Sequence, residues 1–91
     1  MAWGWDPRKD SSNQTKHGVS FELAAEVFND PLHLSEPDPH PDGDRWATIG
    51  CAGPVMLFVV HTLREPDLAI GRIISARRAT RHERRRYEEG V

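Results

Sequence analysis

The chain has 91 residues, a length that is enough for one small domain spanning residues 1–91. Its net charge is −2. Its longest apolar run, residues 55–60, is too short to cross a membrane, and no charged-then-apolar leader opens the sequence, so we expect a cytoplasmic protein. Cys51 is the only cysteine and the five histidines lack ligand spacing, which excludes an internal disulfide and predicts neither a zinc site nor another cofactor.

The start of the sequence predicts a strand followed by two helices. Residues 1–5 alternate in the manner of a short strand, with both tryptophans on one face. Asp6 as N-cap and Gly18 as a left-handed stop bound a polar surface helix. Ser20 fits the cap of a second helix, whose apolar residues recur at helical spacing as far as Phe28.

The middle of the sequence predicts an antiparallel sheet. Residues 32–34 alternate like a short strand, and the Pro, Asp and Gly residues of 36–44 predict an exposed loop. Residues 45–50 and 55–62 predict a hairpin, because a short glycine-containing link joins them. The second strand of this hairpin is almost entirely apolar, so it should be central and buried on both faces. A turn then leads to a further strand over residues 68–79.

Strict alternation along that last strand places Arg72, Ile74 and Ala76 on one face and Ile73, Ser75 and Arg77 on the other. Thr80 and Glu83 then fit a capping box that starts a last helix, which Gly90 ends. That helix has little apolar surface beyond Tyr87. The order of elements predicts an α+β domain with a mainly antiparallel twisted sheet, two N-terminal helices and a C-terminal helix.

Charge is spread unevenly along the chain. Residues 1–44 hold three basic and nine acidic residues, whereas residues 61–91 hold eight arginines and five acidic residues. Such an arginine cluster has three ordinary uses: binding phosphate, binding an acidic protein, and pairing with nearby carboxylates on a solvated face. The turn and strand positions favour geometrically defined phosphate contacts by Arg64, Arg72 and Arg77. The last helix favours diffuse attraction through Arg81, Arg84, Arg85 and Arg86.

Three further residues are candidates for proton transfer. His61 closes the central strand, and an imidazole suits acid–base chemistry, although a lone histidine is more often structural. Lys16 and Glu22 are equally explained by the dipoles of the helices that hold them, since one lies in a last turn and the other in a first turn. The residues alone therefore leave open an RNA-cutting enzyme, a non-catalytic binding module, and a structural subunit of a DNA-binding partner.

Several blocks of the sequence together resemble the BrnT family. They come in the family's order over nearly the whole chain, as residues 5–7 (WDP), 16–22 (KHGVSFE), 61–64 (HTLR) and 72–79 (RIISARRA). The resemblance implies a RelE-like fold and a ribonuclease toxin of a type II toxin–antitoxin module. It also implies a BrnA-like antitoxin as partner, a toxin–antitoxin heterotetramer, and contact with operator DNA only through the antitoxin.

The resemblance implies a site as well. Metal-independent RNA cleavage by the ribose 2′-OH requires groups that move protons and groups that neutralise charge on the phosphate. Neutralisation is expected from Arg64, Arg77 and Arg72. Proton transfer or substrate orientation is expected from Lys16, Glu22 and His61. Further RNA contacts are expected from Arg78, Arg81, Arg84, Arg85 and Tyr87.

Gly71 departs from the family's more usual β-branched residue, so we expect a bulge there that re-aims Arg72. The alternative is a non-catalytic module or co-repressor subunit whose arginines grip an acidic partner or nucleic acid.

Overall fold

A computed structural model of the chain describes residues 3–39, 44–62 and 71–90. Within them the strands form one five-stranded sheet in the order β1-β5-β4-β3-β2. β1 runs parallel to β5 and every other neighbouring pair is antiparallel, which confirms the predicted α+β class and mainly antiparallel sheet. The elements are β1 (Trp3–Gly4), α1 (Pro7–His17), α2 (Phe21–Ala25), the 3₁₀ helix η1 (Glu26–Asn29), β2 (Leu34–Pro37), β3 (Trp46–Ala52), β4 (Val55–His61), β5 (Gly71–Arg78) and α3 (Arg81–Glu89).

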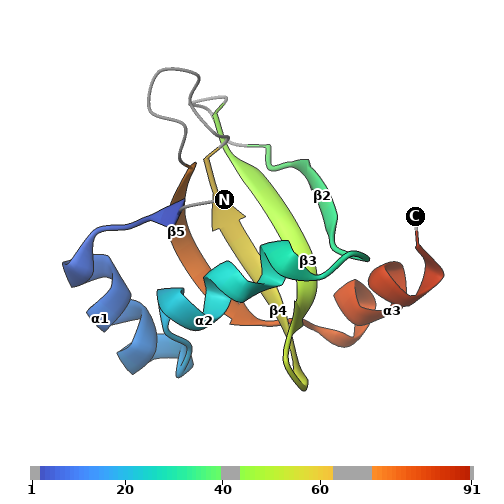
Figure 1. Cartoon of the computed structure of the whole chain (residues 1–91), viewed down its shortest axis with the longest axis horizontal. Coiled ribbons are helices and arrows are strands. Elements are labelled where there is room, and N and C mark those ends of the chain that lie inside the picture. Colours follow the sequence, from blue (N-terminus) through green and yellow to red (C-terminus); the bar gives the residue numbers. More distant parts are fainter. Residues whose placement is uncertain (1–2, 40–43, 63–70, 91) are drawn as a thin grey trace.

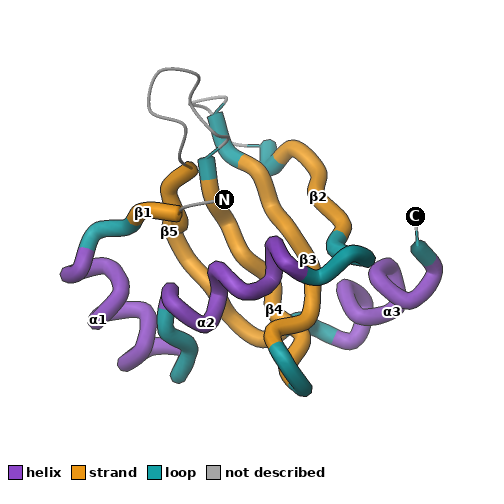
Figure 2. The backbone as a smooth tube through the Cα atoms, in the orientation of Figure 1, coloured by secondary structure: helices purple, strands orange, loops and turns teal. Residues whose placement is uncertain are grey.

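The core lies between the sheet and the first two helices. α2 crosses one face of the sheet, α1 flanks β5, and α3 lies beside β3 and β2 at the opposite end (Figures 1 and 2). Apolar side chains of α2 and η1 meet those of the central strands there, because each element turns one apolar face inward. The fully buried members of this cluster include Phe21, Ala24, Val27, Leu57, Val59, Ile73 and Ala76.

The predicted helix boundaries at Asp6, Gly18 and Ser20 are confirmed by their capping contacts. The Asp6 carboxylate accepts a hydrogen bond from the Arg8 backbone at 2.8 Å, and Gly18 ends α1 with φ of 70°. The Ser20 hydroxyl accepts from the Leu23 backbone at 3.1 Å and starts α2. α2 is shorter than predicted, because the chain tightens into η1 from Glu26 onward. These are local signals, so the sequence carries them without reference to the rest of the fold.

Two strands differ from their predicted bounds. β2 extends to Pro37, although residues 36–44 were expected to form an exposed loop, and its backbone pairs with β3 as far as Trp46. A proline is tolerated there because β2 is an edge strand of the described sheet. β4 is central as predicted, but Phe58 and Val60 are only half-buried on the face away from α2, so burial on both faces is partial. The predicted turn at 64–67 and strand residues 68–70 lie outside the described residues.

A bulge in β5 overturns the predicted alternation. Val60 pairs with Ser75 and His61 with Ile73, so Ile74 has no partner on β4. Ile73 and Ala76 consequently both point into the core, with 1% and 0% of their surface exposed. The residues before Ile73 and after Ala76 alternate away from the core, which places Arg72 and Arg77 on the same face and corrects the prediction that they face opposite ways.

Gly71 is not the site of that bulge. It pairs in register with Trp3 of β1, and a Cβ atom at this position would lie 2.3 Å from the Trp3 ring. The glycine is therefore required for close packing of the tryptophan on β5, which corrects the expected bulge at Gly71.

Candidate functional site

One side chain fixes α1 to β5. The Asn13 amide donates to the backbone oxygens of Val19 and Ala76 at 2.8 Å each, and its oxygen accepts from the Ala76 backbone N–H at 3.1 Å. Asn13 thus bonds Ala76 as a neighbouring strand would, and it is buried, with 7% of its surface exposed. These three bonds hold the otherwise polar α1 against the sheet, since its apolar burial is small.

A basic groove lies between α1 and β5. Its volume is about 190 Å³, and the lining residues within the described part of the chain include no carboxylate. From α1 come Lys9, Ser12, Asn13, Lys16 and His17, and from β5 come Ile74 and Ser75. Cationic side chains and hydroxyl donors around a hollow are the groups that bind phosphate oxygens. We call this hollow the α1–β5 groove.

Arg72 lies on β5, the strand that also supplies the groove residues Ile74 and Ser75. Arg72 is exposed, and its backbone N–H donates to the Thr62 hydroxyl at 2.9 Å while its carbonyl accepts from the Thr62 N–H at 2.9 Å. Those two bonds extend the pairing of β4 with β5 and fix the position from which the guanidinium projects. Ile74 lies two residues further on, about 7 Å along a strand. Arg64, the expected neighbour of Arg72, lies outside the described residues.

Arg77 is engaged within the fold. Its guanidinium donates to both carboxylate oxygens of Glu83 at 2.9 Å and lies 4.3 Å from the centre of the Phe58 ring. The bond to Glu83 raises the pKa of Arg77. Burial acts to raise the pKa of Glu83, but the hydrogen bonds from Arg77 and Thr80 outweigh it and hold that pKa below its usual value. Any phosphate bound by Arg77 would compete with this carboxylate.

Helix α3 is attached by polar contacts. Phe58 points away from the core, so the Arg77–Glu83 pair places the start of α3 on the sheet face opposite α2. One turn further on, Arg86 pairs with Glu36, and the Tyr87 hydroxyl donates to Asp30 at 2.7 Å. The bond to Asp30 raises the pKa of Tyr87. None of the α3 residues is fully buried. Four arginines predicted to contact RNA are exposed, namely Arg78, Arg81, Arg84 and Arg85.

His61 is buried in the core, with 4% of its surface exposed. Its Nδ1 lies 2.8 Å from the Thr62 carbonyl, which can only accept, and its Nε2 lies 2.7 Å from the Thr48 hydroxyl. The Thr48 hydroxyl continues to Ser35 at 2.6 Å, so a polar chain crosses β2, β3 and β4. Burial lowers the pKa of His61 despite the opposing bond to Thr62. The neutral tautomer that donates to Thr62 satisfies every contact, and neither ring nitrogen faces solvent.

Glu22 and Lys16 line different hollows. Glu22 lies with Ser20, Leu23 and Glu26 around a hollow of about 380 Å³ on α2. Of the proton-transfer candidates, the α1–β5 groove therefore contains Lys16 alone. Sequence reasoning missed Lys9 and Ser75 as groove residues, and it treated His17 only as a helix-end residue. The sequence did contain a pattern that groups the α1 residues of the groove, because positions 9, 12, 13 and 16 follow helical spacing and therefore share one face of the helix.

None of the described helices is long and apolar enough to span a membrane. Within residues 3–39, 44–62 and 71–90, no three His, Cys, Asp or Glu side chains gather in a way that could hold a metal ion.

Comparison with known proteins identifies the family. A family model described as the ribonuclease toxin BrnT of type II toxin–antitoxin systems matches residues 5–83. Among solved structures, the crystal structure of the Brucella abortus ribonuclease toxin BrnT matches with a TM-score of 0.65 and 24% sequence identity, over 89% of this chain and 99% of that chain. A search of curated proteins gave no match. The solved structure supports the fold, and the family match over most of the sequence shows that this chain belongs to the BrnT family of type II ribonuclease toxins.

Proposed function

We propose that this toxin cleaves RNA without a metal ion, by attack of a ribose 2′-OH, and that the α1–β5 groove with Arg72 forms its RNA site. The observation that carries the proposal is the groove itself, in which Lys9, Lys16 and His17 surround a hollow whose described lining residues include no carboxylate. A site of that charge attracts the phosphodiester backbone and holds it through hydrogen bonds. The RelE-like character of the fold is part of the same proposal.

The chemistry requires three tasks. A base takes the proton from the 2′-OH as its oxygen attacks the adjacent phosphorus. An acid gives a proton to the departing 5′-oxygen, and the bond from phosphorus to that oxygen breaks, which leaves a 2′,3′-cyclic phosphate. Cationic donors stabilise the charge that builds on the non-bridging oxygens, and one such donor contributes about 3 kcal/mol at comparable sites.

We assign these tasks to the groove and its rim. Lys16 and His17 lie in the groove, where they serve as the proton-transfer groups. Arg72 neutralises the phosphate, joined by Arg64. Arg77 contributes to this neutralisation only if its guanidinium releases the Glu83 carboxylate and binds the phosphate in its place. The exposed arginines Arg78, Arg81, Arg84 and Arg85 attract RNA at longer range, with a strength that falls as salt rises.

We assign no proton transfer to His61 or Glu22, and no base stacking to Tyr87. His61 is buried with both ring nitrogens engaged. Glu22 lines another hollow, where a second carboxylate, Glu26, would repel a phosphate. The Tyr87 ring is held in the α3 contact through its bond to Asp30. His61 and Tyr87 therefore have structural explanations in the fold.

The test measures cleavage of an end-labelled RNA in EDTA, followed by identification of the new 3′ end. We expect cyclic-phosphate products from the wild type and a loss of rate of about a hundredfold in Lys16→Ala, which is typical of a lost proton-transfer group. The matched control is Arg8→Ala, which removes a charge from the same helix outside the groove. RNA that shifts on a gel but keeps its length would support a non-catalytic binding module instead, and equal rates in Lys16→Ala and Arg8→Ala would remove Lys16 from the site.

Membership in a type II toxin family implies a protein antitoxin. We propose that it is of the BrnA type, that it assembles with the toxin as a heterotetramer, and that operator DNA is contacted through the antitoxin. Purified complex should cleave the labelled RNA far more slowly than free toxin. A complex that cleaves as fast as the free toxin would show that the antitoxin does not neutralise this activity.

A further inference from the structure

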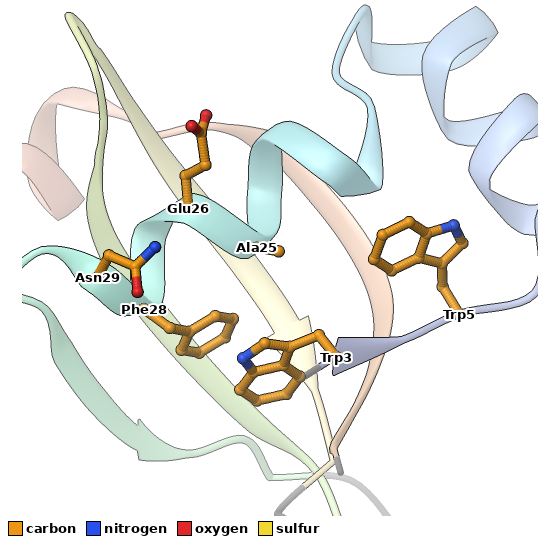
Figure 3. A pocket seen from close by; sticks show the side chains of 6 residues that line it. All are labelled: Trp3, Trp5, Ala25, Glu26, Phe28 and Asn29. Atoms are coloured by element: carbon orange, nitrogen blue, oxygen red, sulfur yellow. The ribbon is translucent and has the colours of Figure 1, made fainter. Parts of the chain in front are cut away.

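An aromatic hollow opens beside α2, away from the α1–β5 groove. Its volume is about 320 Å³, and it is lined by Trp3, Trp5, Ala25, Glu26, Phe28 and Asn29. The Trp3 and Phe28 rings are stacked with centroids 3.9 Å apart. Figure 3 shows the Trp5 indole across the hollow from this stacked pair, with Ala25 between them on α2. The hollow thus presents apolar walls of a size that accommodates one large apolar side chain.

The rim of the hollow is acidic. Glu26 also borders the hollow that contains Glu22, so the two carboxylates stand one helical turn apart on the exposed side of α2 and η1. The ion pairs seen within the described residues include neither of them. No lysine or arginine occurs in the sequence from residue 19 to residue 32. Figure 3 shows the Glu26 carboxylate directed away from the rings.

We propose that this surface, which we call the α2 surface, is the docking site of a basic amphipathic segment of the antitoxin. An apolar side chain of that segment fills the hollow between Trp5 and Phe28, and lysine or arginine residues beside it pair with Glu22 and Glu26. Aromatic pockets with a charged rim are typical anchor points of protein interfaces, because the buried apolar group supplies affinity and the rim supplies specificity.

Charge distinguishes this occupant from RNA. The Glu26 carboxylate beside the hollow and the Glu22 carboxylate one helical turn away repel a phosphodiester backbone, whereas they attract a cationic peptide. RNA and antitoxin would then dock on different parts of the toxin. The proposal depends on the protein antitoxin that family membership implies and does not depend on the cleavage mechanism, because binding can be measured without catalysis.

The test is calorimetric titration of the module's own antitoxin into the full-length toxin. Glu26→Arg should weaken binding about tenfold at low salt and less at about 0.3 M salt, because screening weakens the rim pairs. Ala25→Gln should weaken binding about tenfold at either salt concentration, because the longer side chain occupies the hollow. The matched control is Glu89→Arg, a charge reversal at an exposed position near the end of α3, which should leave affinity within about twofold.

Antitoxin affinities within about twofold of the parent in both Glu26→Arg and Ala25→Gln would overturn the proposal. A parallel titration with a short 2′-O-methyl RNA, which cannot be cleaved, tests the competing occupant. Ala25→Gln should leave RNA affinity unchanged, and a tenfold loss there would assign the hollow to RNA and overturn the proposal as well. Glu26 is exposed, so its replacement leaves the fold intact even if Ala25→Gln lowers stability.

Discussion

Replacing Arg77 tests how α3 is held to the sheet. In the fold its guanidinium makes two bonds of 2.9 Å to Glu83 and stacks on Phe58 at 4.3 Å. Hydrogen bonds to charged groups contribute about 1.5–3 kcal/mol and an exposed cation–π contact about 0.5–1 kcal/mol. Because 36% of the Arg77 side chain is exposed, solvent screening reduces both contributions. We expect Arg77→Ala to lower the free energy of unfolding by about 2 kcal/mol, or Tm by roughly 10 °C in a domain of this size.

A double-mutant cycle isolates the ion pair. Glu83→Gln removes the charge yet keeps an oxygen that can accept from the Thr80 backbone, so the capping box survives. Urea unfolding followed by tryptophan fluorescence should give a coupling energy of about 1 kcal/mol between the two substitutions. Arg81→Ala is the matched control, because Arg81 is exposed at the positive end of the helix dipole and its loss should cost less than about 0.5 kcal/mol.

Additive effects in that cycle, within about 0.3 kcal/mol, would refute the ion pair as the attachment of α3. The same variants also separate structure from chemistry. Glu83→Gln breaks the pair but leaves the guanidinium in place, so it should retain RNA cleavage if Arg77 contacts phosphate. Equal loss of cleavage in Glu83→Gln and Arg77→Ala would show that the position of α3, and not the guanidinium, is what the activity needs.

Three further predictions concern the stability of the fold that holds the candidate site. Asn13→Ala should lower the free energy of unfolding by about 2–4 kcal/mol, because it leaves the Ala76 backbone groups unpaired, and Asn13→Asp should cost more in urea unfolding because a carboxylate meets two carbonyl oxygens. The lowered pKa of His61 means that the unfolded state takes up a proton below about pH 6.5 before the folded state does, so stability should fall as pH drops from about 7.5 to 5.5, and His61→Gln should flatten that dependence. Gly71→Ala should lower Tm, since its Cβ would lie 2.3 Å from the Trp3 ring; an unchanged Tm would show that β1 is not packed tightly on β5.

Local chemistry made much of the fold predictable. The caps at Asp6, Ser20 and Thr80 depend on a few neighbouring residues, and the hairpin of β3 with β4 follows from two apolar runs and a glycine turn. Such signals lie within one stretch of sequence, so periodicity and turn chemistry reveal them. The family resemblance depended on blocks of the same kind, and the family match confirms it.

The site was less predictable because its contacts join distant parts of the chain. Asn13 bonds Ala76, which lies 63 residues further along the sequence. The residues next to either one contain no pattern that predicts this contact. The bulge at Ile74 depends on the register between β4 and β5, and strict alternation misplaced Arg72 relative to Arg77 for that reason. The burial of His61 is set by neighbouring strands, which a lone histidine in a sequence does not reveal.

The amide of Asn13 has a consequence for assembly. An edge strand with free backbone groups is a template for pairing with another chain, which leads to aggregation or to strand exchange. β1 pairs with the start of β5 at Gly71 and Arg72, and the Asn13 side chain hydrogen-bonds the N–H and carbonyl of Ala76. Within the described residues, these two contacts from the N-terminal segment protect the β5 side of the sheet from pairing with another chain. A chain that adds a strand to the described sheet therefore has to approach the other edge, at β2, where Pro37 supplies no N–H.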